Sequence, residues 1–224
     1  MANAWKSDRT VANVVLSPEI GRLAATLAGW PGARLGQDTV WWKTRGAREI
    51  ALHQDSTYIS YLDPPEMITC WIALDETCKD AGTIEYVPGS HTWPLVEKPG
   101  AFHAPVKNYR TAMEHAAAAV GIRSPVVVPA EVSAGSCIFH HGNVWHGSGP
   151  NQRTDKVRRS LGIHILSSQT RFRPTGAGYI YGRYQRVGDT EMDESFFPVL
   201  WTEGGYRSSF LDGYCCGNLP SALQ

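Results

Sequence analysis

The sequence predicts a mainly β fold, a double-stranded β-helix (jelly-roll) barrel with flanking helices. The first observation is that short apolar runs of strand-forming residues recur along the chain, separated by turn signals rich in Gly, Pro, Asp and Asn. The second is that helix start and stop signals occur at only a few places. The third is size, since 224 residues with 42% apolar and 19% charged residues suffice for one β-rich domain with its own core. We therefore predict a single domain over residues 1–224.

The N-terminal quarter opens with a short arm or edge strand, which we expect over residues 11–16. A helix is predicted over residues 17–28, because Ser and Pro open this segment and a Gly follows it. Alternating side chains over residues 35–43 indicate a strand, and so does the run over residues 50–55. These two strands are the first in the chain that carry candidate site residues.

The remainder of the chain continues the pattern of short strands. We expect these strands over residues 67–74, 82–87, 125–129, 135–140 and 158–166. Residues 92–107 contain three of the chain's prolines and read as a loop, and residues 109–120 are alanine-rich and read as a helix capped by Asn108. The helix lies between the reactive segments, where a lid or a substrate wall is expected.

Charge and composition exclude several classes of protein. Basic and acidic residues balance at 21 each, which argues against a broad nucleic-acid or membrane footprint. The start of the chain lacks the apolar core of a signal peptide, and five Cys without framework spacing fit reduced thiols. We expect a cytoplasmic protein with a small-molecule substrate, no nucleic-acid partner and no membrane association, and leave the oligomeric state open.

The most informative stretch is Leu52-His-Gln-Asp55. Residues i and i+2 of a strand point to the same face, so His53 and Asp55 present an imidazole and a carboxylate side by side. His146, in His-Gly-Ser, is the candidate for a third ligand. Two His and one carboxylate on one side of a metal, with open positions opposite, are typical of non-haem Fe(II) oxygenases. The alternative is a hydrogen-bonded structural cluster.

Other histidines compete for the role of ligand. A fourth His would close the positions that catalysis needs open, so we expect these residues to be structural or to support the ligands. They are His91, His140, His141 and His164.

A basic pair opens the strand predicted over residues 158–166. An Arg there can clamp a carboxylate with two parallel hydrogen bonds. Arg158 and Arg159 point to opposite faces of the strand, and Arg158 shares its face with small or polar residues whereas Arg159 shares its face with Leu and Ile. Arg158 is therefore the preferred anion clamp and Arg159 the rival.

Taken together, these segments resemble the phytanoyl-CoA dioxygenase family of Fe(II)/2-oxoglutarate oxygenases. The matching segments occur in the family's order over roughly residues 35–166: Leu35–Lys43, Leu52–Asp55 with Tyr58, Thr69–Asp75, Gly82–His91, and His146–Asn151 with Arg158 and Arg159. The resemblance implies the jelly-roll fold, a single oxygenase domain, Fe(II) as cofactor, and 2-oxoglutarate and O2 as cosubstrates.

The resemblance also implies further site residues. Ser148 falls where the family places a hydroxyl on the far carboxylate of 2-oxoglutarate, and the family pattern favours Arg158 as its clamp. Gln37 and Lys43 lie on the strand that contributes a polar group to 2-oxoglutarate in relatives, and Trp71 matches an aromatic residue near it. The substrate pocket is expected to include two more aromatic residues, Tyr58 and Trp93.

The sequence thus predicts an Fe(II)/2-oxoglutarate-dependent oxygenase. The expected reaction is oxidation of an unactivated C–H bond of a small molecule, by hydroxylation or oxidative cyclisation, in secondary-metabolite or antibiotic tailoring. One alternative is a non-oxidative metal-dependent jelly-roll enzyme, an isomerase or a hydrolase. The other is a non-catalytic barrel that binds small molecules.

Overall fold

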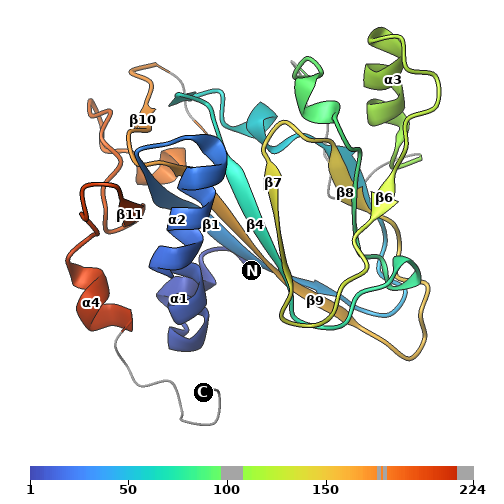
Figure 1. Cartoon of the computed structure of the whole chain (residues 1–224), viewed down its shortest axis with the longest axis horizontal. Coiled ribbons are helices and arrows are strands. Elements are labelled where there is room, and N and C mark those ends of the chain that lie inside the picture. Colours follow the sequence, from blue (N-terminus) through green and yellow to red (C-terminus); the bar gives the residue numbers. More distant parts are fainter. Residues whose placement is uncertain (97–107, 176–177, 179–180, 216–224) are drawn as a thin grey trace. The chain divides into compact units, whose positions relative to one another are not determined.

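The computed structural model describes residues 1–96, 108–175, 178 and 181–215 (Figure 1). Residues 97–107, most of the predicted loop over residues 92–107, lie outside the described residues. The prediction of a mainly β jelly-roll fold is confirmed. Within the described part of the chain, the strands form sheets of five, four and two strands rather than one closed barrel.

The helices and strands are short. The α-helices are α1 (Arg9–Val15), α2 (Pro18–Ala28), α3 (Thr111–Ala119) and α4 (Phe210–Cys215). The strands are β1 (Gly32–Lys43), β2 (Ile50–His53), β3 (Leu62–Asp63), β4 (Ile68–Ala73), β5 (Ile84–Tyr86), β6 (Val128–Pro129), β7 (Cys137–His141), β8 (His146–Ser148), β9 (Arg158–Ser167), β10 (Arg171–Phe172) and β11 (Val199–Thr202). The sheet orders are β11-β1-β9-β4-β7, β2-β8-β5-β6 and β10-β3.

The chain divides into two compact units. The first unit comprises Met1–Val40, Tyr61–Cys70 and Gly162–Gln224, and the second comprises Trp41–Ser60 and Trp71–Leu161. That the chain is one oxygenase domain stays a prediction. None of the helices in the described ranges is both long and apolar enough to cross a membrane.

The first unit carries the N-terminal helices. The prediction of an edge strand over residues 11–16 is wrong, because this segment belongs to α1, whose first turn is capped by Asp8 through the backbone N–H of Val11 at 2.9 Å. Ala12 and Val15, three residues apart, are fully buried, as expected of one face of a helix. The predicted helix over residues 17–28 is confirmed as α2, which ends at Gly29 in the left-handed conformation.

The second unit contains the four-stranded antiparallel sheet β2-β8-β5-β6. Gly147 on β8 lies against the backbone of β2, since a Cβ at this position would lie only 2.7 Å from the carbonyl oxygen of Ile50. A residue with a side chain at position 147 would therefore push the two strands apart. Glycine at this position allows the pairing that brings His53 opposite His146.

Two apolar clusters support this sheet. One packs β2 and the chain around β5 and β8 against α3; its buried members are Leu52, Val87, Trp93, Met113, Ala117 and Trp145. The other joins β4 to β5; its buried members are Trp71, Ala73, Ile84 and Ala130. Burying large side chains of this kind stabilises a fold by about 1.5–3 kcal/mol each, and it fixes the strands that carry the polar residues.

Candidate metal centre and anion site

Three predicted ligands converge in the second unit. His53 is the last residue of β2, and β8 begins with His146, its cross-strand partner. The predicted strand over residues 50–55 ends earlier than expected, because Asp55 opens a 3-10 helix over Asp55–Tyr58. Gln54 nevertheless keeps extended backbone angles, so the alternation of side chains continues for one residue beyond the sheet. Asp55 consequently reaches the same face as His53.

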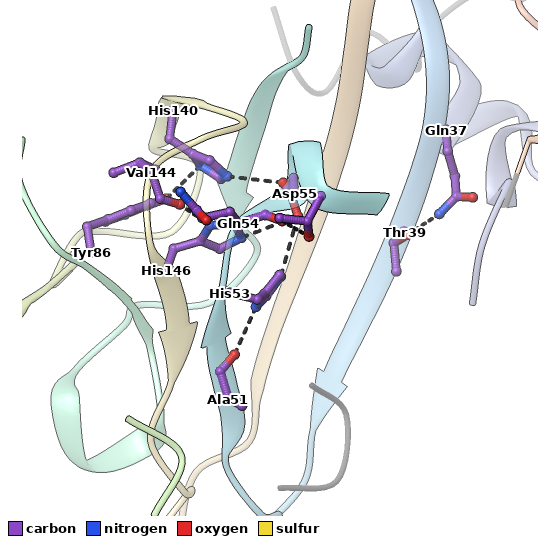
Figure 2. A network of polar contacts seen from close by, with 11 residues as sticks. Gln37, Thr39, Ala51, His53, Gln54, Asp55, Tyr86, His140, Val144 and His146 are labelled. Carbon is purple, nitrogen blue, oxygen red and sulfur yellow. Dashed lines mark hydrogen bonds and ion pairs between the residues drawn. The ribbon is translucent and has the colours of Figure 1, made fainter. Parts of the chain in front are cut away.

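The three side chains offer a compact set of donor atoms (Figure 2). Asp55 Oδ1 lies 3.4 Å from His53 Nε2 and 3.6 Å from His146 Nε2. One donor atom from each residue lies within 4.8 Å of the others. This spacing suits a single ion bound by two imidazoles and one carboxylate.

Both imidazoles are held in the form that a metal ligand requires. His53 Nδ1 lies 2.8 Å from the carbonyl oxygen of Ala51, and His146 Nδ1 lies 3.0 Å from that of Val144. A carbonyl oxygen only accepts, so each Nδ1 carries the proton and each Nε2 keeps its lone pair. Burial lowers the pKa of His146 well below its usual value, which keeps this ring neutral. The residues present therefore fit a ferrous ion.

Tyr58 lies beside this centre. Its ring is 6.3 Å from that of His53 in an edge-on arrangement. Burial, and then the charge of Asp55, raise the pKa of the phenol to about 12, so Tyr58 stays protonated. Trp93, the other predicted substrate contact, lies in the apolar cluster with Leu52 and is 9% exposed. A substrate contact by either residue stays a prediction.

A second polar group lies at the other end of β8. Lys43, the last residue of β1, is buried and donates from Nζ to Ser148 Oγ at 2.7 Å and to the carbonyl oxygen of Gly149. Lys43 and Ser148 were each predicted to contact 2-oxoglutarate, and this hydrogen bond brings the two residues together.

The two candidate arginines have different environments. Arg159 is on the surface and makes a two-pronged ion pair with Asp75, with Nη2–Oδ1 at 2.6 Å and Nε–Oδ2 at 3.0 Å. Arg158 is 3% exposed and donates to the carbonyl oxygen of Gly82, at 3.0 Å from Nη2, and to Ser160 Oγ, at 2.7 Å from Nη1. Within the described part of the chain, Arg158 therefore bonds only to neutral oxygen atoms, whereas Arg159 is paired with the carboxylate of Asp75.

The positive charge of Arg158 affects the ionisation of Lys43. Burial, and then the positive charge of Arg158, lower the pKa of Lys43 to about 7. Burial lowers the pKa of Arg158 to about 10, so it remains charged at neutral pH. Within the described ranges, the hydrogen bonds of both cations go to neutral oxygen atoms. Two buried cations without a carboxylate partner are costly, and an anion bound between them would offset this cost.

Two other predicted residues have partners of their own. Gln37 belongs to the first unit, where its side-chain amide donates to Thr39 at 3.0 Å. Trp71 is buried in the second apolar cluster, where it packs with Ile84. Contacts of Gln37 or Trp71 with 2-oxoglutarate stay predictions.

The structure adds two residues to which sequence reasoning gave no role at the site, Tyr86 and Gly82. The register of β5 against β8 places Tyr86 opposite His146, and the backbone of Gly82 binds Arg158. Neither contact could be predicted from the sequence, because the first depends on strand register and the second on turn geometry. Tyr86 also lines a cavity of about 220 Å³ together with His91, Ile138, Phe139, His140, His141 and Val144.

The chain is similar to several known proteins. The dioxygenase trt7 of Aspergillus terreus is 31% identical over 169 residues, which cover 73% of this chain and 48% of that protein. The chain thus spans about half the length of this relative. Two solved structures, described as the non-haem α-ketoglutarate-dependent epimerase SnoN and carbocyclase SnoK from nogalamycin biosynthesis, are 26% and 25% identical, with TM-scores of 0.69 and 0.67. The alignments cover 89% of this chain in both cases, and 76% and 74% of those chains.

The family assignment rests on the match to a family model. The family model described as phytanoyl-CoA dioxygenase (PhyH) matches residues 2–160, which include His53, Asp55, His146 and Arg158. This match covers more than half of the chain and all the residues that form the candidate centre. The chain belongs to the phytanoyl-CoA dioxygenase (PhyH) family.

Proposed function

We propose that the protein is an Fe(II)/2-oxoglutarate-dependent oxygenase that oxidises an unactivated C–H bond of a small molecule. His53, Asp55 and His146 would hold the iron, and Arg158, Lys43 and Ser148 would bind the far carboxylate of 2-oxoglutarate. The observation that carries the proposal is the pair of buried cations in the same compact unit as the metal ligands. A 2-oxo diacid uses such a pair for its far carboxylate, whereas a metal-dependent isomerase or hydrolase needs one only for an anionic substrate.

The protein's own residues contribute binding, orientation and exclusion of water. When bound, ferrous iron with 2-oxoglutarate and O2 would supply the oxidant for the C–H bond. The three ligands would leave positions free for the cosubstrates, and the carbonyl contacts of His53 and His146 keep both rings oriented. The buried setting of Arg158 strengthens its attraction for a carboxylate. Catalysis would then depend on placing one C–H bond of the substrate close to the metal.

The relatives support a role in tailoring secondary metabolites. SnoN and SnoK are described as an epimerase and a carbocyclase of nogalamycin biosynthesis. Both reaction names are consistent with a first step that removes hydrogen from a C–H bond. The two reactions would then differ in what happens to that carbon afterwards. We propose hydroxylation or oxidative cyclisation of an antibiotic-type small molecule for this chain, with product analysis deciding between these outcomes.

Formation of succinate from 2-oxoglutarate tests this proposal. Purified protein is incubated aerobically with Fe(II), ascorbate and 2-oxoglutarate, without a substrate, and succinate is quantified. We expect slow formation of succinate that disappears when Fe(II) is replaced by Zn(II). Absence of both succinate and 2-oxoglutarate binding in the metal-loaded wild type would favour the non-oxidative enzyme or the binding protein instead.

The depressed pKa of Lys43 predicts that 2-oxoglutarate binding depends on pH. Only charged Lys43 attracts the carboxylate, and in the free protein it loses its proton as the pH rises through about 7. Binding of the dianion should therefore take up a proton above this pH, and affinity should fall by up to about tenfold per pH unit. Calorimetry between pH 6.5 and 8.5, in buffers of different ionisation enthalpy, measures both quantities.

Two variants separate this effect from other titrating groups. Lys43→Met should bind 2-oxoglutarate more weakly than wild type below pH 7 and should lose the proton uptake. Lys156→Met removes a partly exposed lysine that pairs with Glu76, and it should retain the wild-type pH profile. An unchanged profile in Lys43→Met would remove Lys43 from the anion site.

A further inference from the structure

A third imidazole lies against the candidate ligands without being one of them. His140, on β7, is 7% exposed, and its ring centroid lies 4.5 Å from that of His146 (Figure 2). His140 Nε2 is buried and makes no hydrogen bond within the described residues. The carboxylate oxygen Oδ2 of Asp55 lies 3.7 Å from His140 Nε2. A buried polar atom of this kind ordinarily has a function or a partner.

The two oxygens of Asp55 face different imidazoles. Oδ1 is the oxygen near His53 Nε2 and His146 Nε2, at 3.4 and 3.6 Å, and Oδ2 is the oxygen near His140 Nε2. The carboxylate is thus oriented with one oxygen toward the candidate metal position and the other toward His140. When a carboxylate binds a metal through one oxygen, its other oxygen remains a strong hydrogen-bond acceptor. A donor at that second oxygen fixes the orientation of the carboxylate.

Hydrogen bonding distinguishes the ring of His140 from the two ligand rings. His53 and His146 each place Nδ1 against a backbone carbonyl, which fixes the proton on Nδ1 and frees Nε2. His140 Nδ1 instead lies 3.0 Å from the hydroxyl of Tyr86, which is able to donate. If Tyr86 donates to Nδ1, the proton of neutral His140 is on Nε2 and points at Asp55 Oδ2. The opposite tautomer would set a lone pair against a carboxylate, which is repulsive.

We propose that His140, held by Tyr86, is a positioning residue that donates from Nε2 to Asp55 Oδ2 and so presents Oδ1 alone to the metal. The proposal rests on the metal centre assigned above. The 3.7 Å between His140 Nε2 and Asp55 Oδ2 exceeds the length of a hydrogen bond, about 2.7–3.2 Å, and a small rotation of the carboxylate would close the gap. Sequence reasoning left His140 among the supporting or structural histidines, and the contact with Asp55 gives it a specific partner.

The tautomer of His140 is measured directly by NMR. Two-bond nitrogen–proton correlations on ¹⁵N-histidine-labelled protein, metal-free and Zn(II)-loaded, report which ring nitrogen carries the proton. We expect Nε2–H for His140 and Nδ1–H for His53 and His146. A proton on Nδ1 of His140, or a shift showing that Nε2 binds Zn(II), would overturn the proposal. This readout does not involve 2-oxoglutarate, so it is separate from the test of the oxygenase function.

Metal affinity provides the second readout. His140→Phe removes the donor but keeps a ring, and it should weaken Co(II) binding by about 10–100-fold, the usual effect of losing a partner of a ligand. His140→Gln, whose amide N–H can reach the same oxygen, should recover most of the affinity, and Tyr86→Phe should give an intermediate loss. His115→Phe, on the exposed face of α3, is the matched control.

The visible spectrum of bound Co(II) separates positioning from general damage. We expect His140→Phe to alter the Co(II) bands while the melting temperature of the metal-free protein stays close to that of wild type. Wild-type Co(II) affinity and bands in His140→Phe would contradict the proposal. If His140→Phe does not fold, the tautomer measurement on the wild type and the affinity of Tyr86→Phe decide the question.

Discussion

Replacing His146 by Ala is expected to weaken Fe(II) binding by at least about 100-fold and to abolish formation of succinate. His146 supplies one of the three donor atoms that lie within 4.8 Å of one another, and its ring is buried and neutral. Loss of a residue that merely supports a ligand already costs about 10–100-fold in metal affinity, so loss of a ligand should cost more. Anaerobic Fe(II) titration, with Co(II) as an optical probe, measures the change.

Two further variants make this expectation specific. Asp55→Asn keeps the shape of the side chain and removes its charge, so it should weaken metal binding without a cavity. His115→Ala removes an exposed imidazole on α3 and should leave metal binding unchanged. Equal metal affinity in His146→Ala and wild type, with both proteins folded, would mean that the three side chains form only a structural hydrogen-bonded cluster.

Replacing Arg158 by Ala is expected to weaken 2-oxoglutarate binding by about 100-fold, or about 2.7 kcal/mol. A buried guanidinium that makes charge-assisted hydrogen bonds to a carboxylate contributes an energy of this size. Metal binding should be largely retained, because Arg158 bonds to Gly82 and Ser160 rather than to a metal ligand. Calorimetric titration of 2-oxoglutarate into the Zn(II)-loaded protein, which cannot turn over, measures the affinity.

The neighbouring arginine provides the control. Arg159→Ala removes an exposed cation whose partner is Asp75, and exposed ion pairs contribute about 0–1 kcal/mol. We expect its 2-oxoglutarate affinity to stay within about twofold of wild type, since the residue faces away from the buried cations. The reverse result, with Arg159→Ala impaired and Arg158→Ala intact, would place the clamp on the other face of β9.

The sequence predicted three side chains that the structure brings together. His53, Asp55 and His146 were recognisable because few residue types bind iron and because the i, i+2 spacing puts two of them on one face. The strand carrying Arg158 was predicted from its apolar alternation and is confirmed as β9. The same reasoning misread residues 11–16, where a run of β-branched and apolar residues looked like a strand and the cap by Asp8 made a helix.

What the sequence left open depends on register and backbone geometry. The contact of Tyr86 with His140 requires the pairing of β5 with β8 and the neighbouring position of β7. The contact of Arg158 with the carbonyl oxygen of Gly82 requires a turn in the left-handed conformation. Neither hydrophobic periodicity nor motif spacing encodes these distances, because strand pairing is a long-range property of the folded chain.

Anaerobic addition of 2-oxoglutarate to the Fe(II)-loaded protein tests the proposed site most directly. A 2-oxo acid that chelates ferrous ion gives a visible charge-transfer absorption, which reports metal and cosubstrate in one signal. The wild type should develop this band with one equivalent each of Fe(II) and 2-oxoglutarate, and Arg158→Ala should need about 100-fold more 2-oxoglutarate. A wild-type protein that binds Fe(II) tightly yet gives no band at saturating 2-oxoglutarate would contradict the proposed oxygenase.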